Sequence, residues 1–102
     1  MAFGTMAIHV GHEPGKWDMN QVVPPISLST TYMQDMPGEP KGHDYSRAGN
    51  PTRDVLQENL AALEGGKYAR VFASGLSGTM AIANILKTGD HIICSDDVYG
   101  GE

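Results

Sequence analysis

The chain has 102 residues and a formal net charge of −5, with 12 acidic residues against 7 basic ones. Its composition, 40% hydrophobic and 19% charged, is typical of a folded rather than a disordered chain. No run of basic residues is present, which argues against a nucleic-acid or anionic-membrane partner. The single cysteine, Cys94, excludes an intrachain disulfide, and the first residues lack the features of a secretory signal. We therefore expect a cytoplasmic protein with no membrane-spanning segment.

Residues 1–49 are predicted to form an extended arm. This region shows no sustained helical or strand period, and it holds most of the prolines: Pro14, Pro24, Pro25, Pro37 and Pro40. A stretch of this length without much regular structure is unusual in an isolated domain. We expect the arm to lie on another surface, either other parts of the polypeptide or a second subunit.

The next segment predicts a helix over residues 51–64. Asn50 suits the N-cap position, Pro51 the first helical position and Asp54 the first turn. Leucines then follow at helical spacing, at positions 56, 60 and 63, and a Gly-Gly pair ends the pattern.

Beyond this helix, the pattern predicts a strand at 67–74, a helix at 75–87 and a second strand at 91–95. Strand, helix and strand in succession form a β-α-β unit, in which the strands run parallel with a right-handed crossover. Residues 50–102 are therefore interpreted as the beginning of an α/β domain with a mainly parallel sheet.

A glycine-rich segment, ASGLSGT at 73–79, joins the first predicted strand to its helix. Glycines allow close approach to the backbone, and a helix N-terminus carries free N–H groups and partial positive charge, so this arrangement suits a phosphate. The segment matches neither the Walker A loop nor the complete dinucleotide-binding fingerprint. A tight turn in which Ser74 caps the helix explains it equally well.

A second anion-binding candidate is YSRAGNPTR at 45–53. If residues 45–47 are extended, Tyr45 and Arg47 project to the same side. The guanidinium can then bind two oxygens of a phosphate while the phenol donates another hydrogen bond. Alternatively, Arg47 forms a surface salt bridge and Tyr45 belongs to the core.

The third candidate is SDDVYGG at 95–101, directly after the second predicted strand. Ligands of parallel sheets bind beyond the carboxyl ends of the strands, so this loop and the glycine-rich segment are expected to border one crevice. Tyr99 is then free to lay its ring against a flat ligand. Alternatively, Tyr99 packs on a neighbouring segment and the two aspartates are simply solvated.

Four motifs, VVPPISLSTTY, YSRAGNPTR, FASGLSGT and DDVYGG, occur in an order and spacing that resemble the cystathionine γ-lyase branch of the Cys/Met-metabolism pyridoxal-phosphate enzymes. The resemblance extends from about Ala7 to Gly101. It implies an incomplete fold, consisting of an arm and the start of the large domain of a fold type I transferase. It also implies that the backbone of Gly75 and Leu76 cradles the phosphate of pyridoxal 5′-phosphate (PLP), while Tyr99 stacks on the pyridine ring.

The same resemblance implies that Tyr45 and Arg47 reach the cofactor phosphate of a neighbouring subunit, in a homotetramer built as a dimer of dimers. The implied activity is that of a carbon–sulfur lyase of transsulfuration and cysteine biosynthesis. Such an enzyme converts L-cystathionine into L-cysteine, 2-oxobutanoate and ammonia.

Other interpretations stay open within and outside the family. Gly101 stands where methionine γ-lyases typically carry a cysteine, and VVPPISLSTTY is nearer to γ-lyases than to cystathionine γ-synthases. The family's catalytic lysine, typically in a Ser-x-Thr-Lys context, has no counterpart among these residues, so the chain alone is expected to be inactive. A non-catalytic assembly module is therefore one alternative, and an unrelated phosphate-binding β-α-β domain is another.

The remaining candidates point to packing rather than chemistry. His9 and His12 have a spacing that metal ligands use, but no further cluster completes a site. Cys94 is expected to be a core thiol of the second strand. His43 lies near the proposed site without a motif role.

Overall fold

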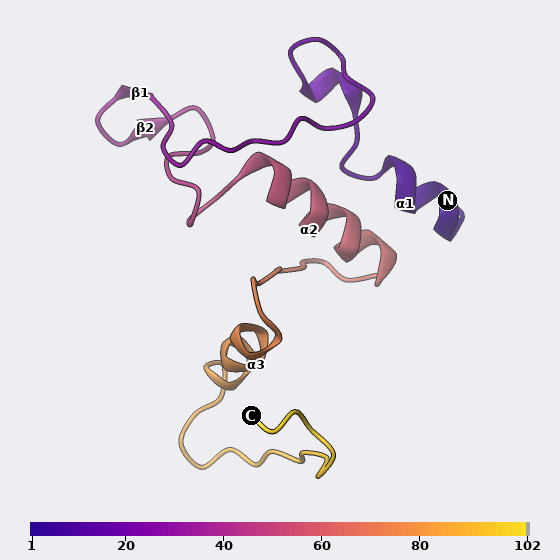
Figure 1. The fold of residues 1–102 in the computed structure, drawn as a ribbon, viewed down its shortest axis with the longest axis vertical. Coiled ribbons are helices and arrows are strands. Elements are labelled where there is room, and N and C mark those ends of the chain that lie inside the picture. Colours follow the sequence, from indigo (N-terminus) through magenta and orange to yellow (C-terminus); the bar gives the residue numbers. More distant parts are fainter. Residues whose placement is uncertain (102) are drawn as a thin grey trace. The chain divides into compact units, whose positions relative to one another are not determined.

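The computed structural model describes residues 1–101, which divide into two compact units (Figure 1). The first unit is Met1–Arg70, and the second begins at Val71. The predicted domain boundary between residues 49 and 50 lies inside the first unit. That boundary stays a prediction for the complete protein.

Helix α2, Pro51–Leu63, is the longest element of the first unit. The Asn50 side chain caps it by accepting hydrogen bonds from the backbone N–H groups of Thr52 (2.9 Å) and Arg53 (3.1 Å). The helix ends at Leu63 with Glu64 at the C-cap position, and Gly65 follows with a φ of +63°, a left-handed conformation that favours glycine. The prediction of a helix over residues 51–64 is confirmed.

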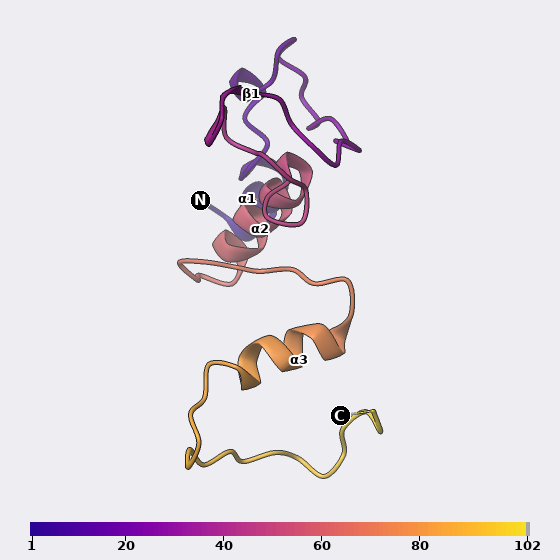
Figure 2. The same ribbon diagram turned by 90° about the vertical axis from the view of Figure 1, so that its left-hand side faces the viewer.

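Helix α1, Phe3–His9, lies beside α2 (Figures 1 and 2). The amide of Asn59 on α2 donates hydrogen bonds of 3.0–3.2 Å to three carbonyl oxygens at the end of α1, those of Met6, Ala7 and Val10. Gly11 adopts a φ of +80° close to α2, where an added Cβ would lie 2.9 Å from the carbonyl oxygen of Val55. Sequence analysis did not predict α1, since Ala2 provides no side-chain cap.

The arm contains more regular structure than predicted. Strands β1, Gln34–Met36, and β2, Glu39–Pro40, form an antiparallel hairpin with an irregularity in its register (Figure 1). Gly38 makes the turn with a φ of +82°. An isolated antiparallel bridge pairs Thr31 with Tyr45, so residues that flank the hairpin also lie side by side.

A short 3₁₀ helix, η1, Pro14–Lys16, forms a salt bridge with α2. The Lys16 ammonium bonds to Glu13 and lies 3.4 Å from a carboxylate oxygen of Glu58. The hydrogen bond from Lys16 holds the pKa of the Glu13 carboxyl below its ordinary value, and the same bond raises the pKa of Lys16. These side chains are exposed, so solvent screening keeps the contribution to stability small.

The second unit is built around α3, Gly75–Ala83. Ser74 caps this helix, because its hydroxyl accepts a hydrogen bond of 3.2 Å from the N–H of Ser77. The helix begins where the sequence predicted, but it ends at Ala83 rather than at residue 87. Asn84 occupies the C-cap position, and its side-chain amide donates to the carbonyl oxygen of Met80 (2.8 Å).

The strands predicted at residues 67–74 and 91–95 are not formed, so residues 1–101 contain no parallel β-α-β unit. A strand is stable when a neighbour satisfies its backbone N–H and C=O groups. Neither segment is paired with another strand in the described part of the chain. The second segment is also exposed rather than buried, with Ile92 at 61% and Ile93 at 92% exposure.

No hydrophobic side chain is fully buried among residues 1–101. Large apolar side chains are exposed in both units, and they include Val22, Val23, Ile26, Leu28, Met33, Met80, Ile82 and Ile85. Within the same residues, the helices are too short or too polar to cross a bilayer.

Candidate functional site

Tyr45 and Arg47 lie together on the loop that precedes α2. The guanidinium carbon of Arg47 is 4.5 Å from the centroid of the Tyr45 ring, a distance typical of a cation–π contact. Arg47 is exposed and Tyr45 is half-buried. The alternative salt bridge from Arg47 is not seen among residues 1–101. The guanidinium is therefore available to an anion.

The backbone of this loop is ordered by the neighbouring chain segment and by its own turn. The N–H of Ser46 donates to the carbonyl oxygen of Thr30 (2.9 Å), beside the bridge between Thr31 and Tyr45. The carbonyl oxygen of Tyr45 then accepts two hydrogen bonds of 3.0 Å, from the N–H groups of the residues at positions 48 and 49. These bonds close a tight turn that begins at Tyr45 and contains Arg47, so residues 45–47 are not extended, contrary to the expectation from the sequence.

Arg53, in the first turn of α2, binds the same loop. Its guanidinium donates to the carbonyl oxygens of Ser46 (2.9 Å) and Arg47 (3.3 Å). Hydrogen bonds from charged donors contribute about 1.5–3 kcal/mol each, toward the lower end where solvent reaches them. None of the sequence motifs predicted a role for Arg53. A cation in the first turn opposes the helix dipole, and this is the sequence signal that could have indicated one.

Two other side chains at the start of α2 hold residues 25–27. The Asn50 amide donates to the carbonyl oxygen of Ser27 (3.2 Å). The Thr52 hydroxyl donates to the carbonyl oxygen of Pro25 (3.1 Å) and accepts from the N–H of Ser27 (2.8 Å). The start of α2 therefore fixes two separate segments of the arm.

His43 has a structural role that sequence analysis did not assign. Its Nε2 lies 2.8 Å from a carboxylate oxygen of Asp54, and its ring centroid lies 5.7 Å from that of Tyr32. Gly49 packs against the same imidazole, where an added Cβ would come within 2.9 Å of its Cδ2 atom. The imidazole thus joins the end of the hairpin, the loop and α2.

Gly75 and Leu76 form the first turn of α3, as predicted. The first backbone N–H groups of an α-helix have no acceptor within the helix, and they point along its axis. A Cβ built on Gly75 meets no atom within 4 Å, so an anion can approach this backbone closely. The hydroxyls of Ser74 and Ser77 are hydrogen-bonded to each other (2.8 Å), which leaves one hydroxyl proton as a further donor at the same end. The donor set fits a phosphate monoester.

Tyr99 belongs to the second unit and is 77% exposed. Its ring lies against the backbone of Gly101, where an added Cβ would come within 2.6 Å of the ring carbon Cε1. The structure thus keeps Tyr45 with Arg47 in the first unit, and Gly75, Leu76 and Tyr99 in the second.

The remaining candidates stay outside this chemistry. Within residues 1–101, no group of His, Cys, Asp and Glu side chains is arranged to hold a metal ion. The expectation that Cys94 is a core thiol is wrong, because its thiol is exposed and the strand expected to bury it is not formed.

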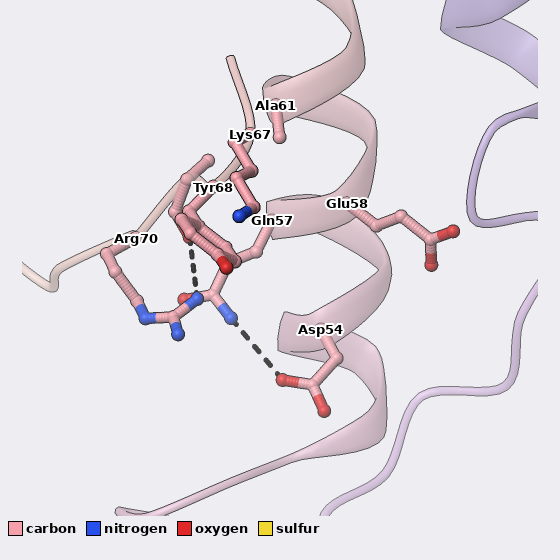
Figure 3. A pocket seen from close by; sticks show the side chains of 8 residues that line it. Asp54, Gln57, Glu58, Ala61, Lys67, Tyr68 and Arg70 are labelled. Carbon is pink, nitrogen blue, oxygen red and sulfur yellow. Dashed lines mark hydrogen bonds between the residues drawn. The ribbon is translucent and has the colours of Figure 1, made fainter.

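A pocket of about 210 Å³ opens on one side of α2, between the helix and the residues that follow it (Figure 3). Its lining residues are Asp54, Gln57, Glu58, Ala61, Lys67, Tyr68, Ala69 and Arg70. In Figure 3 the Gln57 amide donates to Asp54 (3.3 Å), the Arg70 guanidinium donates to the carbonyl oxygen of Ala69 (3.0 Å), and Glu58 points away from the group. None of the predicted site residues lines this pocket.

Comparison with known proteins places this geometry in a family. The family model described as Cys/Met metabolism PLP-dependent enzyme matches residues 4–102. Over 97% of the chain, the sequence is 79% identical to a protein from Caenorhabditis elegans named putative cystathionine gamma-lyase 2, and 59% identical to human cystathionine gamma-lyase. The matches cover 25% and 24% of those proteins, so the chain spans about a quarter of their length.

Solved structures agree with the sequence comparison. The metB crystal structure from Corynebacterium glutamicum has a TM-score of 0.89 and 46% sequence identity, and yeast cystathionine gamma-lyase has a TM-score of 0.84 and 43% identity. Each alignment covers 99% of this chain and 26% or 25% of the solved chain. The expected fold class, a partial α/β fold of this enzyme type, is confirmed at this level, although its sheet is not formed within residues 1–101.

Proposed function

Because the chain belongs to the Cys/Met-metabolism PLP-dependent enzyme family, we propose that it is part of a carbon–sulfur lyase that acts on L-cystathionine. The reaction would combine L-cystathionine with water and release L-cysteine, 2-oxobutanoate and ammonia. Identity to relatives that bear the γ-lyase name favours this activity over the γ-synthase and methionine γ-lyase alternatives.

One observation carries the cofactor assignment: the exposed guanidinium of Arg47 lies over the Tyr45 ring, on a loop whose backbone is hydrogen-bonded to Thr30 and to Arg53. A guanidinium held in this way binds two phosphate oxygens, while the phenol hydroxyl donates to a third. In the neighbouring subunit, the start of α3 supplies the other half of the proposed phosphate site, through the backbone of Gly75 and Leu76 and the partial positive charge of the helix end.

Tyr99 supplies the surface for the cofactor ring in this proposal. Its exposed aromatic face is available for offset stacking on a planar heterocycle, which orients the ring without a covalent bond. PLP, when bound, supplies the electron sink for carbon–sulfur bond cleavage. The residues of this chain hold and orient that group, and the catalytic lysine comes from outside the 102 residues.

The test uses a chimera in which this chain replaces the matching quarter of the C. elegans relative. We expect the chimera to bind PLP and to release 2-oxobutanoate from L-cystathionine. The unmodified relative is the positive control. If the relative is active and the chimera binds PLP without releasing 2-oxobutanoate, the lyase assignment is wrong. If a folded chimera does not bind PLP, the cofactor assignment is wrong.

The proposed cross-subunit role of Arg47 can be tested by complementation, in the same chimera. One copy carries Arg47→Ala and the other Gly75→Glu, which places a carboxylate in the phosphate cradle. If Arg47 serves the neighbouring subunit, a mixed pair contains one site with both defects and one intact site. Random pairing then restores activity at about a quarter of all sites. If each residue serves its own subunit, the mixture stays inactive.

A further inference from the structure

Arg53 is a cation near the proposed phosphate site that the proposed function does not use. It lies in the first turn of α2, where the helix dipole disfavours positive charge, and it is half-buried. Its hydrogen bonds to the loop that carries Tyr45 and Arg47 therefore account for its placement better than the helix does.

The two carbonyl groups that accept hydrogen bonds from the Arg53 guanidinium belong to the two peptide units that flank the Cα atom of Arg47. The carbonyl of Ser46 belongs to the peptide unit before the Arg47 Cα, and the carbonyl of Arg47 belongs to the peptide unit after it. Because each peptide unit is planar, restraining both of them restrains the two backbone torsions of Arg47 and hence the direction of its Cα–Cβ bond. The rigid, planar guanidinium is suited to this task, since two of its donors reach two acceptors at a set separation.

We propose that Arg53 is a positioning residue for the phosphate of the cofactor, which it serves by aiming Arg47. The proposal rests on the proposed function, in which Arg47 binds that phosphate. Arg47 is then held at its backbone by Arg53 and at its guanidinium by the ring of Tyr45. A side chain fixed at both ends loses less conformational freedom when it binds an anion, which strengthens binding.

The test compares PLP with pyridoxal, which lacks the phosphate, in the chimera described above. We expect Arg53→Gln to raise the dissociation constant of PLP about tenfold, because one charged hydrogen bond from Arg47 to the phosphate is then no longer held in place. The dissociation constant of pyridoxal should not change. Arg53→Lys should show a smaller loss, because the ammonium keeps the positive charge although it lacks the planar fork. Arg70→Gln is the matched control, since Arg70 bonds only to its neighbour's carbonyl among the contacts described, and it should behave like the parent.

Two further measurements distinguish positioning from general loss of structure. In an Arg47→Ala background, Arg53→Gln should add no further loss of PLP affinity, because the residue through which it acts is gone. Amide hydrogen exchange at positions 48 and 49, in the turn next to the Arg53 contacts, should be faster in Arg53→Gln than in the control.

Equal losses for PLP and pyridoxal, or additive losses with Arg47→Ala, would overturn the proposal. So would an unchanged PLP affinity in Arg53→Gln. If Arg53→Gln does not assemble, the same comparison is made with Arg53→Lys, which keeps the charge. A parent chimera that does not bind PLP would contradict the proposed function itself, which separates that failure from failure of this inference.

Discussion

The two units of the chain are stabilised in different ways. In the first unit, polar side chains at the start of α2 bind segments distant in sequence, as when Asn50 bonds to Ser27 and Asp54 pairs with His43. In the second unit, the bonds around α3 include short-range ones, such as Ser74 with Ser77 and Asn84 with Met80. Neither unit buries a hydrophobic side chain fully among residues 1–101. Specific polar contacts can therefore position a segment that has no core of its own.

The largest expected effect tests the close approach of α1 to α2. Gly11→Ala places a Cβ 2.9 Å from the carbonyl oxygen of Val55 at a residue with a φ of +80°. We expect the local free energy of opening to fall by about 2 kcal/mol or more, because strain and steric overlap add. Amide hydrogen exchange in α1 and the facing turn of α2 measures the change in the chimera.

Gly4→Ala is the matched control for this substitution. Gly4 lies within α1 and a Cβ there meets no atom within 4 Å, so alanine should be neutral or slightly stabilising. Equal protection in the two variants would show that the close approach of α1 to α2 contributes nothing to stability.

A smaller effect separates the two functions of Asn50, which caps α2 and also binds the arm. Asn50→Ala removes both, with an expected cost of about 2 kcal/mol from cap and hydrogen bond together. Asn50→Asp keeps the capping oxygens but loses the amide donor to Ser27, so about 1 kcal/mol should be lost. Hydrogen exchange at the N–H groups of Thr52 and Arg53 reports the cap. If both variants cost the same, the bond to Ser27 is not a separate contribution.

The smallest effect is expected in the second unit. Ser74→Ala removes the cap of α3 and should lower the local stability of that helix by about 1 kcal/mol. Faster exchange of the Ser77 amide measures the loss, and Ser74→Asn, which can still cap, should restore it. If the loss spreads to α2 amides, the second unit is not stabilised by short-range contacts in the way described here.

The helices were predictable where a local polar signal marks the boundary. Asn50 and Pro51 fixed the start of α2, and Ser74 marked the start of α3, because a cap acts on its own helix and needs no distant partner. The predicted end of α3 was wrong because the apolar sequence continues beyond Ala83, whereas the helix stops there with Asn84 at the C-cap position. Gly38, which makes the turn of the hairpin, belongs to the Pro37-Gly38 pair, and such a pair is a sequence signal that predicts a turn.

The strands were not predictable in the same way, because pairing is a property of two segments. Ile92 and Ile93 are residue types that favour buried strands, yet no segment among residues 1–101 forms a strand beside them. For the candidate site, Tyr45 and Arg47 do lie together, but residues 46–48 form a turn rather than the extended backbone from which their proximity was predicted. The contribution of Arg53 could not be predicted from the sequence, because its two acceptors are backbone carbonyl groups, and every residue carries one.

The lack of a fully buried hydrophobic side chain among residues 1–101 has a calorimetric consequence. The heat-capacity increase on unfolding and the denaturant dependence of stability both scale with the apolar surface that becomes newly exposed. Much of that surface is already in contact with solvent in this chain. We therefore expect these residues, studied on their own, to melt over a broad temperature range and with a weak dependence on denaturant.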